Sequence, residues 1–313
     1  MTKGYVAAVD IGGTSLRVAL ADLSGKVIAR WSASTEGIRD AAVVVERIRA
    51  GVEEMMREQS LEKSALRAVA AGAPGVTNAA EGVVIATSYL MGWRDVPLRA
   101  MLEEALGVPA TVDNDVNAAA LGEGWAGEAK GIRDFVFVAI GTGVGAGIVL
   151  NGKLFQGMGW TAGEIGYMLV PGTPEEPVER GKPGALEGVV GGEGIRDYWQ
   201  SAWRAKKTGL PRILHATEIF DAAMQGDELA EAVLHRSAKT LAYAIYNMAL
   251  VINCPLFVLG GGVGMHPALV DETRRILYER GTRIRPEIVS STLGADAQLM
   301  GAVRLALDLV TME

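Results

Sequence analysis

The sequence predicts an α/β protein built from two similar lobes. Short apolar, strand-like runs alternate with amphipathic, helix-like stretches along its 313 residues, a length that suits two lobes of ordinary domain size. Aligning Ile11 with Ile140 matches strand, glycine turn, strand, small turn and strand in both halves. This weak internal repeat implies lobes that each begin with three strands and each present a glycine turn to a shared cleft.

Turn-forming pairs separate the apolar runs of the first half. Gly12-Gly13 and Ser24-Gly25 divide three strands, and Pro74-Gly75 closes a later one. Apolar residues at helical spacing predict an amphipathic helix over residues 40–59. The strands expected here cover residues 5–10, 15–21, 26–32, 66–73, 82–86 and 110–113, and the helices cover residues 40–59, 99–106 and 116–125.

The pattern restarts with the apolar residues 135–140, which lead into a second glycine-rich turn. Residues 170–184 are rich in Pro, Gly and charge without an apolar period, so we expect an excursion loop there. Residues 228–253 are long and alanine-rich, as in a core helix. The strands expected here cover residues 135–140, 146–150 and 256–259, and the helices cover residues 193–204, 217–224, 228–253, 266–279 and 296–310.

The composition argues against several classes of protein. A hydrophobic content of 49% predicts a folded chain, and a net charge of −7 argues against a nucleic-acid surface, which needs clustered Lys and Arg. The apolar run 135–150 is too short for a membrane helix, and the residues from Met1 to the first strand lack the apolar h-region of a signal peptide. The single Cys254 fits a reducing compartment. We therefore expect a cytoplasmic protein that binds a small molecule and neither nucleic acid nor membrane.

Two glycine turns follow strand-like runs and predict phosphate binding. One is Asp10 to Thr14 and the other is Ile140 to Gly145. Backbone N–H groups in such turns can cradle phosphates, although a tight hairpin turn explains each one taken alone. A third cluster at Gly260 to Gly262 would let the backbone approach an adenosine. In this interpretation Thr14 and Thr142 supply hydroxyl donors, and Asp10 helps to hold Mg²⁺, usually through water.

The run Asp113 to Asn117 places acids and amides where a strand turns into a helix. Asp115 is the candidate general base, because phosphoryl transfer to a sugar hydroxyl requires removal of that hydroxyl's proton. Asn114 can exchange hydrogen bonds with adjacent hydroxyls. The alternative is a helix N-cap, a position that Asp and Asn favour.

Five motifs, in order along the chain, resemble those of the ROK (repressor, ORF, kinase) family. They are Asp10-Ile11-Gly12-Gly13-Thr14, Gly72-Ala73-Pro74-Gly75, Asp113 to Glu123, Gly141 to Gly147 and Gly163-Glu164-Ile165-Gly166. The resemblance runs nearly end to end. It implies a two-lobed, actin-like ATPase fold of the ribonuclease-H-like type, with a small lobe of residues 1–117 plus 296–313 and a large lobe of residues 118–295.

The resemblance also implies a sugar kinase that uses ATP and Mg²⁺, with Asp115 as the catalytic base. The sugar would be glucose or a close relative, while N-acetylmannosamine, N-acetylglucosamine, mannose and fructose stay open, as does polyphosphate as donor. The expected sugar site consists of Gly75, Asn114, Asp115, Glu164, Tyr167 and Glu187. The expected nucleotide site consists of Asp10, Gly12, Gly13, Thr14, Arg17, Gly141, Thr142, Gly143, Gly261 and Gly262, with Arg17 where many members carry Lys. A homodimer or homotetramer is the expected assembly.

The chain departs from the family at the structural zinc site. Members bind zinc with one His and three Cys, and the corresponding residues here are Tyr167, Val178, Arg180 and Ala185. We therefore expect no zinc site. Tyr167 would either offer its hydroxyl to a ligand or fill the space of the metal. Ser88-Tyr89 occupies a place where members often carry an Asn near the sugar.

Two readings compete with the kinase. Sugar-sensing regulators of the family carry a DNA-binding domain before the first glycine turn, but here nine residues precede Asp10, so we expect a kinase. A non-catalytic sugar-binding protein is disfavoured because Asp10, Asp115 and the glycine turns all remain.

Overall fold

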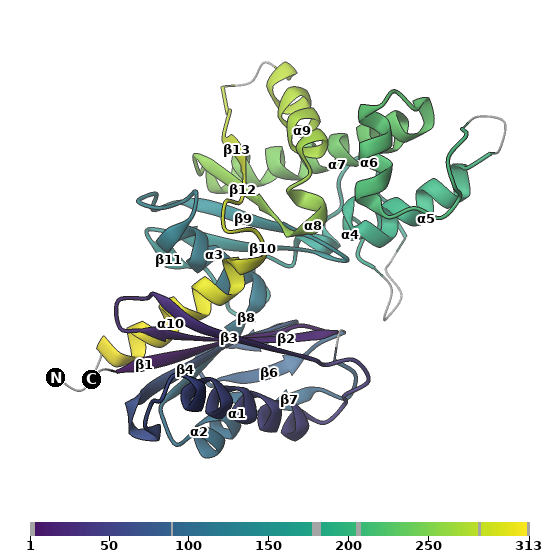
Figure 1. The fold of residues 1–313 in the computed structure, drawn as a ribbon. Helices are drawn as coiled ribbons and strands as arrows, with labels where there is room; N and C mark the ends of the chain where they lie inside the picture. The colour runs from purple at the N-terminus through teal and green to yellow at the C-terminus, as the bar shows by residue number, and fades with distance from the viewer. Residues whose placement is uncertain (1–3, 89, 177–182, 205–207, 281–282, 312–313) are drawn as a thin grey trace. The chain divides into compact units, whose positions relative to one another are not determined.

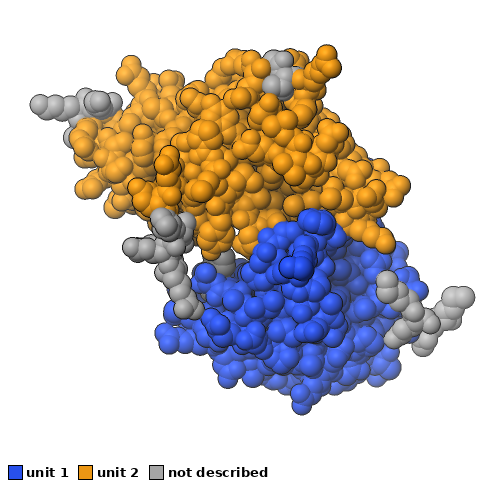
Figure 2. All heavy atoms as spheres, turned by 180° about the vertical axis from the view of Figure 1, so that it is seen from behind, with its two compact units in different colours: residues 1–130, 154–162, 296–313 blue, residues 131–153, 163–295 orange. Residues whose placement is uncertain are grey.

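The computed structural model describes residues 4–88, 90–176, 183–204, 208–280 and 283–311 (Figure 1). Their contacts divide the chain into two compact units, coloured separately in Figure 2. Unit 1 contains residues 1–130, 154–162 and 296–313, and unit 2 contains residues 131–153 and 163–295. Each unit has helices packed around a sheet, which confirms the α/β class.

The main sheet of unit 1 has the strand order β3-β2-β1-β4-β8. Its strands are β1 (Tyr5–Ile11), β2 (Ser15–Asp22), β3 (Val27–Ser34), β4 (Leu66–Ala73) and β8 (Ala110–Asn114). The first three form an antiparallel meander, whereas β1, β4 and β8 run parallel. The carboxyl ends of the parallel strands therefore meet at one edge, where α/β sheets collect functional groups.

Helices cover both faces of this sheet, as Figure 1 shows. Helices α1 (Ala41–Glu58) and α2 (Leu98–Leu106) bury one face together with β-strand residues such as Val9 and Ala71. Helix α10 (Ala297–Thr311) covers the opposite face, where Ala8 and Ala70 lie. The small residues on this second face allow the helix to pack close to the sheet.

Helix α3 (Asp115–Ala126) follows β8 directly and packs along α10. The two helices approach so closely that a Cβ atom at Gly301 would overlap the carbonyl oxygen of Ala118, and one at Gly122 would overlap that of Ala297. Glycine is therefore required at both positions. This packing places all of α3 in unit 1, whereas the expected boundary between the lobes, 117/118, falls inside the helix.

A small antiparallel sheet, β5 (Val76–Asn78), β6 (Val83–Ala86) and β7 (Arg94–Val96), lies between β4 and α2 in the chain. The apolar pattern predicted β6, but β5 and β7 are too short to show a period of two residues.

Unit 2 repeats the topology of unit 1, with the strand order β11-β10-β9-β12-β13. Its strands are β9 (Phe135–Ile140), β10 (Val144–Leu150), β11 (Lys153–Leu154), β12 (Leu256–Gly260) and β13 (Glu287–Ser290). Strands β9 and β10 are antiparallel, while β9, β12 and β13 are parallel. The predicted repeat of strand, glycine turn and strand is therefore present in both units. Edge strands β11 and β13 were not predicted from the sequence.

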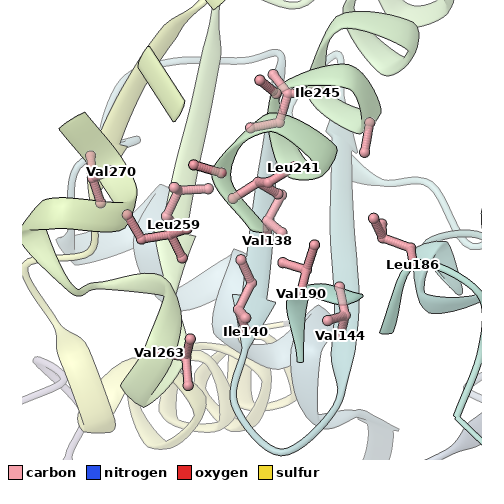
Figure 3. Close-up of a cluster of buried hydrophobic side chains, with 14 of the residues drawn as sticks. Val138, Ile140, Val144, Leu186, Val190, Leu241, Ile245, Leu259, Val263 and Val270 are labelled. Carbon is pink, nitrogen blue, oxygen red and sulfur yellow. The ribbon is translucent and has the colours of Figure 1, made fainter. Parts of the chain in front are cut away.

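The helices of unit 2 are α4 (Glu187–Val190), α5 (Gly192–Ala202), α6 (Ala216–Met224), α7 (Glu228–Ile252), α8 (Gly261–Gly264) and α9 (Pro267–Glu279). Helix α7 is the predicted core helix, and Leu241 and Ile245 on it are fully buried. Figure 3 shows these side chains in one apolar cluster with Ile140 and Val144, which flank the second glycine turn. The core of unit 2 thus lies directly behind that turn.

Short 3₁₀ helices complete the described structure at Lys63–Ala65, Ile165–Tyr167 and Gly294–Asp296. Among the described residues, no helix is both long enough and apolar enough to cross a membrane.

Candidate functional site

The predicted site residues divide between the units. Unit 1 holds Asp10, Gly12, Gly13, Thr14, Arg17, Gly75, Asn114 and Asp115, and unit 2 holds Gly141, Thr142, Gly143, Glu164, Tyr167, Glu187, Gly261 and Gly262.

In unit 1, Asp10 lies at the carboxyl end of β1 and is 7% exposed. It is the direct cross-strand partner of Arg17 on β2, and the Arg17 guanidinium donates from Nε at 2.9 Å and from Nη2 at 2.6 Å to Asp10 Oδ2. Burial raises the pKa of Asp10, and the ion pair with Arg17 opposes that rise. Arg17 therefore stabilises a buried negative charge at the edge of the sheet.

The first glycine turn is a tight hairpin whose backbone is held by hydrogen bonds. The Gly12 N–H donates to the Ser15 carbonyl oxygen at 2.7 Å. The buried Thr35 hydroxyl donates to Gly12 O at 2.7 Å, and the Thr35 N–H donates to Thr14 O at 3.1 Å. The hairpin alternative and the phosphate-binding hypothesis are compatible, because a turn whose backbone is fixed by these hydrogen bonds can present its other N–H groups to a phosphate.

Asn114 is the N-cap of α3. Its Oδ1 accepts from the N–H groups of Val116 at 2.8 Å and Asn117 at 3.1 Å, and its Nδ2 donates to Gly75 O at 2.8 Å. The capping alternative thus applies to Asn114 itself. Because the amide oxygen already accepts two bonds, a ligand hydroxyl at this residue would use chiefly the remaining Nδ2 hydrogen.

Gly75 has a positive φ of 94°, and a Cβ atom there would overlap the carbonyl oxygen of Ala86. Glycine is needed at this turn after β4 for both reasons. The bond from Asn114 to Gly75 therefore joins two turns that follow neighbouring parallel strands.

Asp115 is the first residue of α3, and its carboxylate accepts from the Val116 N–H at 2.9 Å. Its Cα would lie 3.3 Å from a Cβ atom at Gly72, so the start of the helix sits close over β4. Residues Asp10, Gly72 and Asp113 are aligned across β1, β4 and β8. Residues aligned in parallel strands share one face, so the structure brings Asp10 and the Asp113–Asp115 turn to the same face and edge of the sheet.

In unit 2, the second glycine turn is braced by the start of α5. The Gly192 N–H donates to Gly141 O at 2.8 Å. A Cβ atom at Gly191 would lie 2.9 Å from Thr142 O, and one at Gly192 would lie 3.0 Å from Gly141 O. This glycine pair is needed for the close approach. This pair was not predicted from the sequence, although two glycines at the start of a helix are a recognisable signal.

Gly261 begins α8 with a positive φ of 79°, and a Cβ atom there would overlap the carbonyl oxygen of Ile140. The third glycine cluster therefore packs against the end of β9, next to the second glycine turn. At Gly262, by contrast, a Cβ atom would meet open space. The structure brings Gly141–Gly143 and Gly261–Gly262 together at one edge of the unit 2 sheet.

Two carboxylates, Glu164 and Glu187, lie close enough in unit 2 to repel one another. Glu187 Oε2 accepts from the Val144 N–H at 2.9 Å, which ties α4 to the first residue of β10. Enclosure by protein, and then repulsion from Glu187, raise the pKa of Glu164. Glu164 nonetheless remains exposed to solvent.

Tyr167 ends the 3₁₀ helix Ile165–Tyr167 and is 58% exposed. A ring this exposed does not fill a buried space in place of a metal, and a contact between its hydroxyl and a ligand stays a prediction. Ala185 is buried, while Val178, Arg180 and Tyr89 lie outside the described residues.

The chain matches the ROK family over residues 6–309. It is 34% identical over 312 residues to a glucokinase of Halalkalibacterium halodurans, covering 96% of this chain and 94% of the relative. It is 33% identical to an N-acetylmannosamine kinase of Escherichia coli, covering 96% of this chain and 97% of the relative. A ROK family glucokinase from Streptomyces griseus, solved with glucose and AMPPNP, superposes with a TM-score of 0.78 at 28% identity, covering 97% of this chain and all of that chain. The superposition confirms the predicted fold class.

Proposed function

Because the chain belongs to the ROK family, we propose that it is a sugar kinase that transfers the γ-phosphoryl group of ATP to a hydroxyl of glucose or a closely related hexose. The relatives named above are sugar kinases that match almost the whole chain. The observation that carries the proposal is the turn from β8 to α3, where Asp115 stands at the open edge of the sheet on the face shared with Asp10.

Asp115 acts as the general base in this proposal. As the sugar oxygen attacks the γ-phosphorus, its proton passes to the Asp115 carboxylate, and the bond from the γ-phosphorus to the β,γ-bridging oxygen breaks so that ADP leaves. Asn114, Gly75, Glu164, Glu187 and Tyr167 would contact the other sugar hydroxyls. Amide and carboxylate groups suit this task because each sugar hydroxyl can both donate and accept a hydrogen bond.

The glycine turns hold the nucleotide in this proposal. The backbone N–H groups of Gly13 and Thr14 would face the phosphates, while the Gly12 N–H holds the turn by donating to Ser15 O. Gly141 to Gly143 would also bind phosphate, and Gly261 and Gly262 would lie against the adenosine. A carboxylate with ordered surroundings, such as Asp10, fits Mg²⁺, which binds proteins through few carboxylates and keeps several waters. Mg²⁺ would neutralise charge on the phosphates, while Arg17 keeps Asp10 in place.

Three further parts of the proposal concern the molecule as a whole. We propose a homodimer or homotetramer that works in the cytoplasm without a structural zinc. Light scattering coupled to gel filtration measures the oligomer, and elemental analysis measures zinc. A stoichiometric zinc content would refute the last part.

The experiment that tests the function is a coupled assay of ATP consumption over glucose, mannose, fructose, N-acetylglucosamine and N-acetylmannosamine, repeated with polyphosphate as donor. We expect glucose to give the highest kcat/KM with ATP. Asp115→Asn should lower kcat by about 10²–10⁴-fold, the usual contribution of a general base. The matched control is Asp197→Asn, which removes an exposed carboxylate on α5 and should leave kcat unchanged. Failure to phosphorylate any sugar would refute the kinase proposal.

A further inference from the structure

Asp113 is a buried carboxylate that the reaction proposed above does not use. It is 4% exposed at the end of β8, two residues before Asp115. Its Oδ1 accepts from the Asn114 N–H at 2.7 Å and from Asn117 Nδ2 at 2.9 Å. Burying a carboxylate costs free energy unless hydrogen bonds satisfy its oxygens. The hydrogen bonds of Asp113 therefore deserve a functional explanation.

The third partner of Asp113 comes from a distant part of the chain. Gln156 Nε2 donates to Asp113 Oδ2 at 2.8 Å, across a separation of 43 residues. Gln156 belongs to residues 154–162, which pack in unit 1 although the chain on either side belongs to unit 2. One carboxylate therefore connects this segment with the strand end, the N-cap and the first turn of α3.

These bonds restrain the peptide that carries Asp115 on both sides. Asp113 holds the Asn114 N–H before it and the Asn117 side chain after it, while Asn114 caps the helix and reaches Gly75. A general base must be aligned with its proton to within a fraction of an ångström, and small displacements reduce the rate strongly.

We propose that Asp113 and Gln156 are positioning residues for Asp115, with Gln156 anchoring residues 154–162 to the turn that carries the catalytic base. This inference rests on the proposed function. Both residues act through hydrogen bonds to the turn and not by touching the sugar. Other charged groups at this edge of the sheet are Asp10 on β1 and Arg17 on β2, which pair with each other.

The first test is Gln156→Met, which keeps the approximate length of the side chain and removes the N–H donor. We expect kcat to fall about tenfold while the sugar KM changes less than about threefold, because alignment matters most in the transition state. The control is Met158→Ala, at a fully exposed residue of the same segment, which should match the parent in both constants. If Gln156→Met does not fold, Gln156→Asn, which is too short to reach Asp113, takes its place with the same expected result.

The second test is a double-mutant cycle with Asp113→Asn. If the two residues act through each other, the double variant should lose no more kcat than the more severe single variant. If the kcat losses of the two single variants multiply in the double variant, the inference is overturned. It is also overturned if Gln156→Met has the same kcat as Met158→Ala, or if Gln156→Met changes only the KM or the thermal stability.

Failure of this inference is distinguishable from failure of the proposed function. The activity of the parent tests the function, and only the ratio of variant to parent tests the positioning. In a parent without turnover, the readout is hydrogen exchange of the Asn114 amide. Its protection should be lost in Gln156→Met and kept in Met158→Ala, and equal protection in both would overturn the inference.

Discussion

Asp10 and Arg17 are opposed on adjacent strands, and the guanidinium of Arg17 donates two hydrogen bonds to a single oxygen, Oδ2, of the Asp10 carboxylate. The Arg17 side chain is 28% exposed and that of Asp10 is 9% exposed. The pair therefore belongs to the partly buried class, in which loss of one partner leaves the other uncompensated.

Arg17→Met should destabilise unit 1 by about 3 kcal/mol at pH 8. Burial already raises the folded-state pKa of Asp10, and removing Arg17 raises it further. A carboxyl group with a raised folded-state pKa costs stability as the pH rises from its unfolded-state pKa through its folded-state pKa. Urea unfolding at pH 5 and pH 8 should thus show a smaller loss at pH 5. Arg17→Lys, which keeps the charge, should lose less, and an equal loss at both pH values for Arg17→Met would contradict the explanation.

Gly261→Ala should destabilise the protein by about 2–3 kcal/mol and raise the KM for ATP, because the new Cβ atom meets the Ile140 carbonyl at a positive φ. Gly262→Ala is the matched control for stability, since a Cβ atom there meets open space. Urea unfolding and ATP titration measure both effects. Equal stability of the two variants would show that the positive φ is not required.

Asn114→Asp should separate the cap of α3 from the bond to Gly75. The aspartate keeps an oxygen that accepts from Val116 and Asn117, so stability should stay within about 1 kcal/mol of the parent. It loses the N–H donor to Gly75 and to any ligand hydroxyl, so kcat/KM for the sugar should fall about tenfold or more. Asn114→Ala also removes the cap, and its free energy of unfolding should be about 1 kcal/mol lower than that of Asn114→Asp. Parental kinetics in Asn114→Asp would exclude a role for its N–H group.

Glu164→Gln should raise the melting temperature at pH 8 while lowering sugar affinity. Enclosure and the neighbouring Glu187 raise the pKa of Glu164, so its ionised form costs stability above its unfolded-state pKa. Removing the charge should raise the melting temperature by about 1–2 °C. In a protein of this size, such a rise corresponds to well under about 1 kcal/mol of added stability. The gain should largely vanish by pH 4, where Glu164 is mostly protonated in both states. Calorimetry at the two pH values measures it, and a gain that persists at pH 4 would point to packing instead of charge.

Local pattern was sufficient for most of the fold. The strands on either side of both glycine turns and the long helix α7 follow from apolar spacing and turn residues, because a strand or helix of that length shows its period in the sequence. Strands β5, β7, β11 and β13 lack that signal. They are short, and their pairing depends on neighbours that the chain brings alongside only after folding.

The local sequence pattern could not predict which residue of the Asp113–Asn117 run takes which role. Both capping and catalysis favour Asp and Asn at this position, so the residue types alone left the two roles open. Hydrogen bonds in the structure assign the cap to Asn114 and the buried anchor to Asp113. Gln156 carried no signal at all, since a glutamine in a loop has no preferred partner until the chain folds.

The sequence by itself determined the two repeated α/β units, the glycine turns and the candidate base, because strand period, turn chemistry and residue type are local properties. Only the tertiary structure decided which polar atoms meet: Arg17 with Asp10, Asn114 with Gly75, and Gln156 with Asp113. These bonds join residues on different strands, turns and loops, so they exist only once packing of the apolar core has set the register of the sheet.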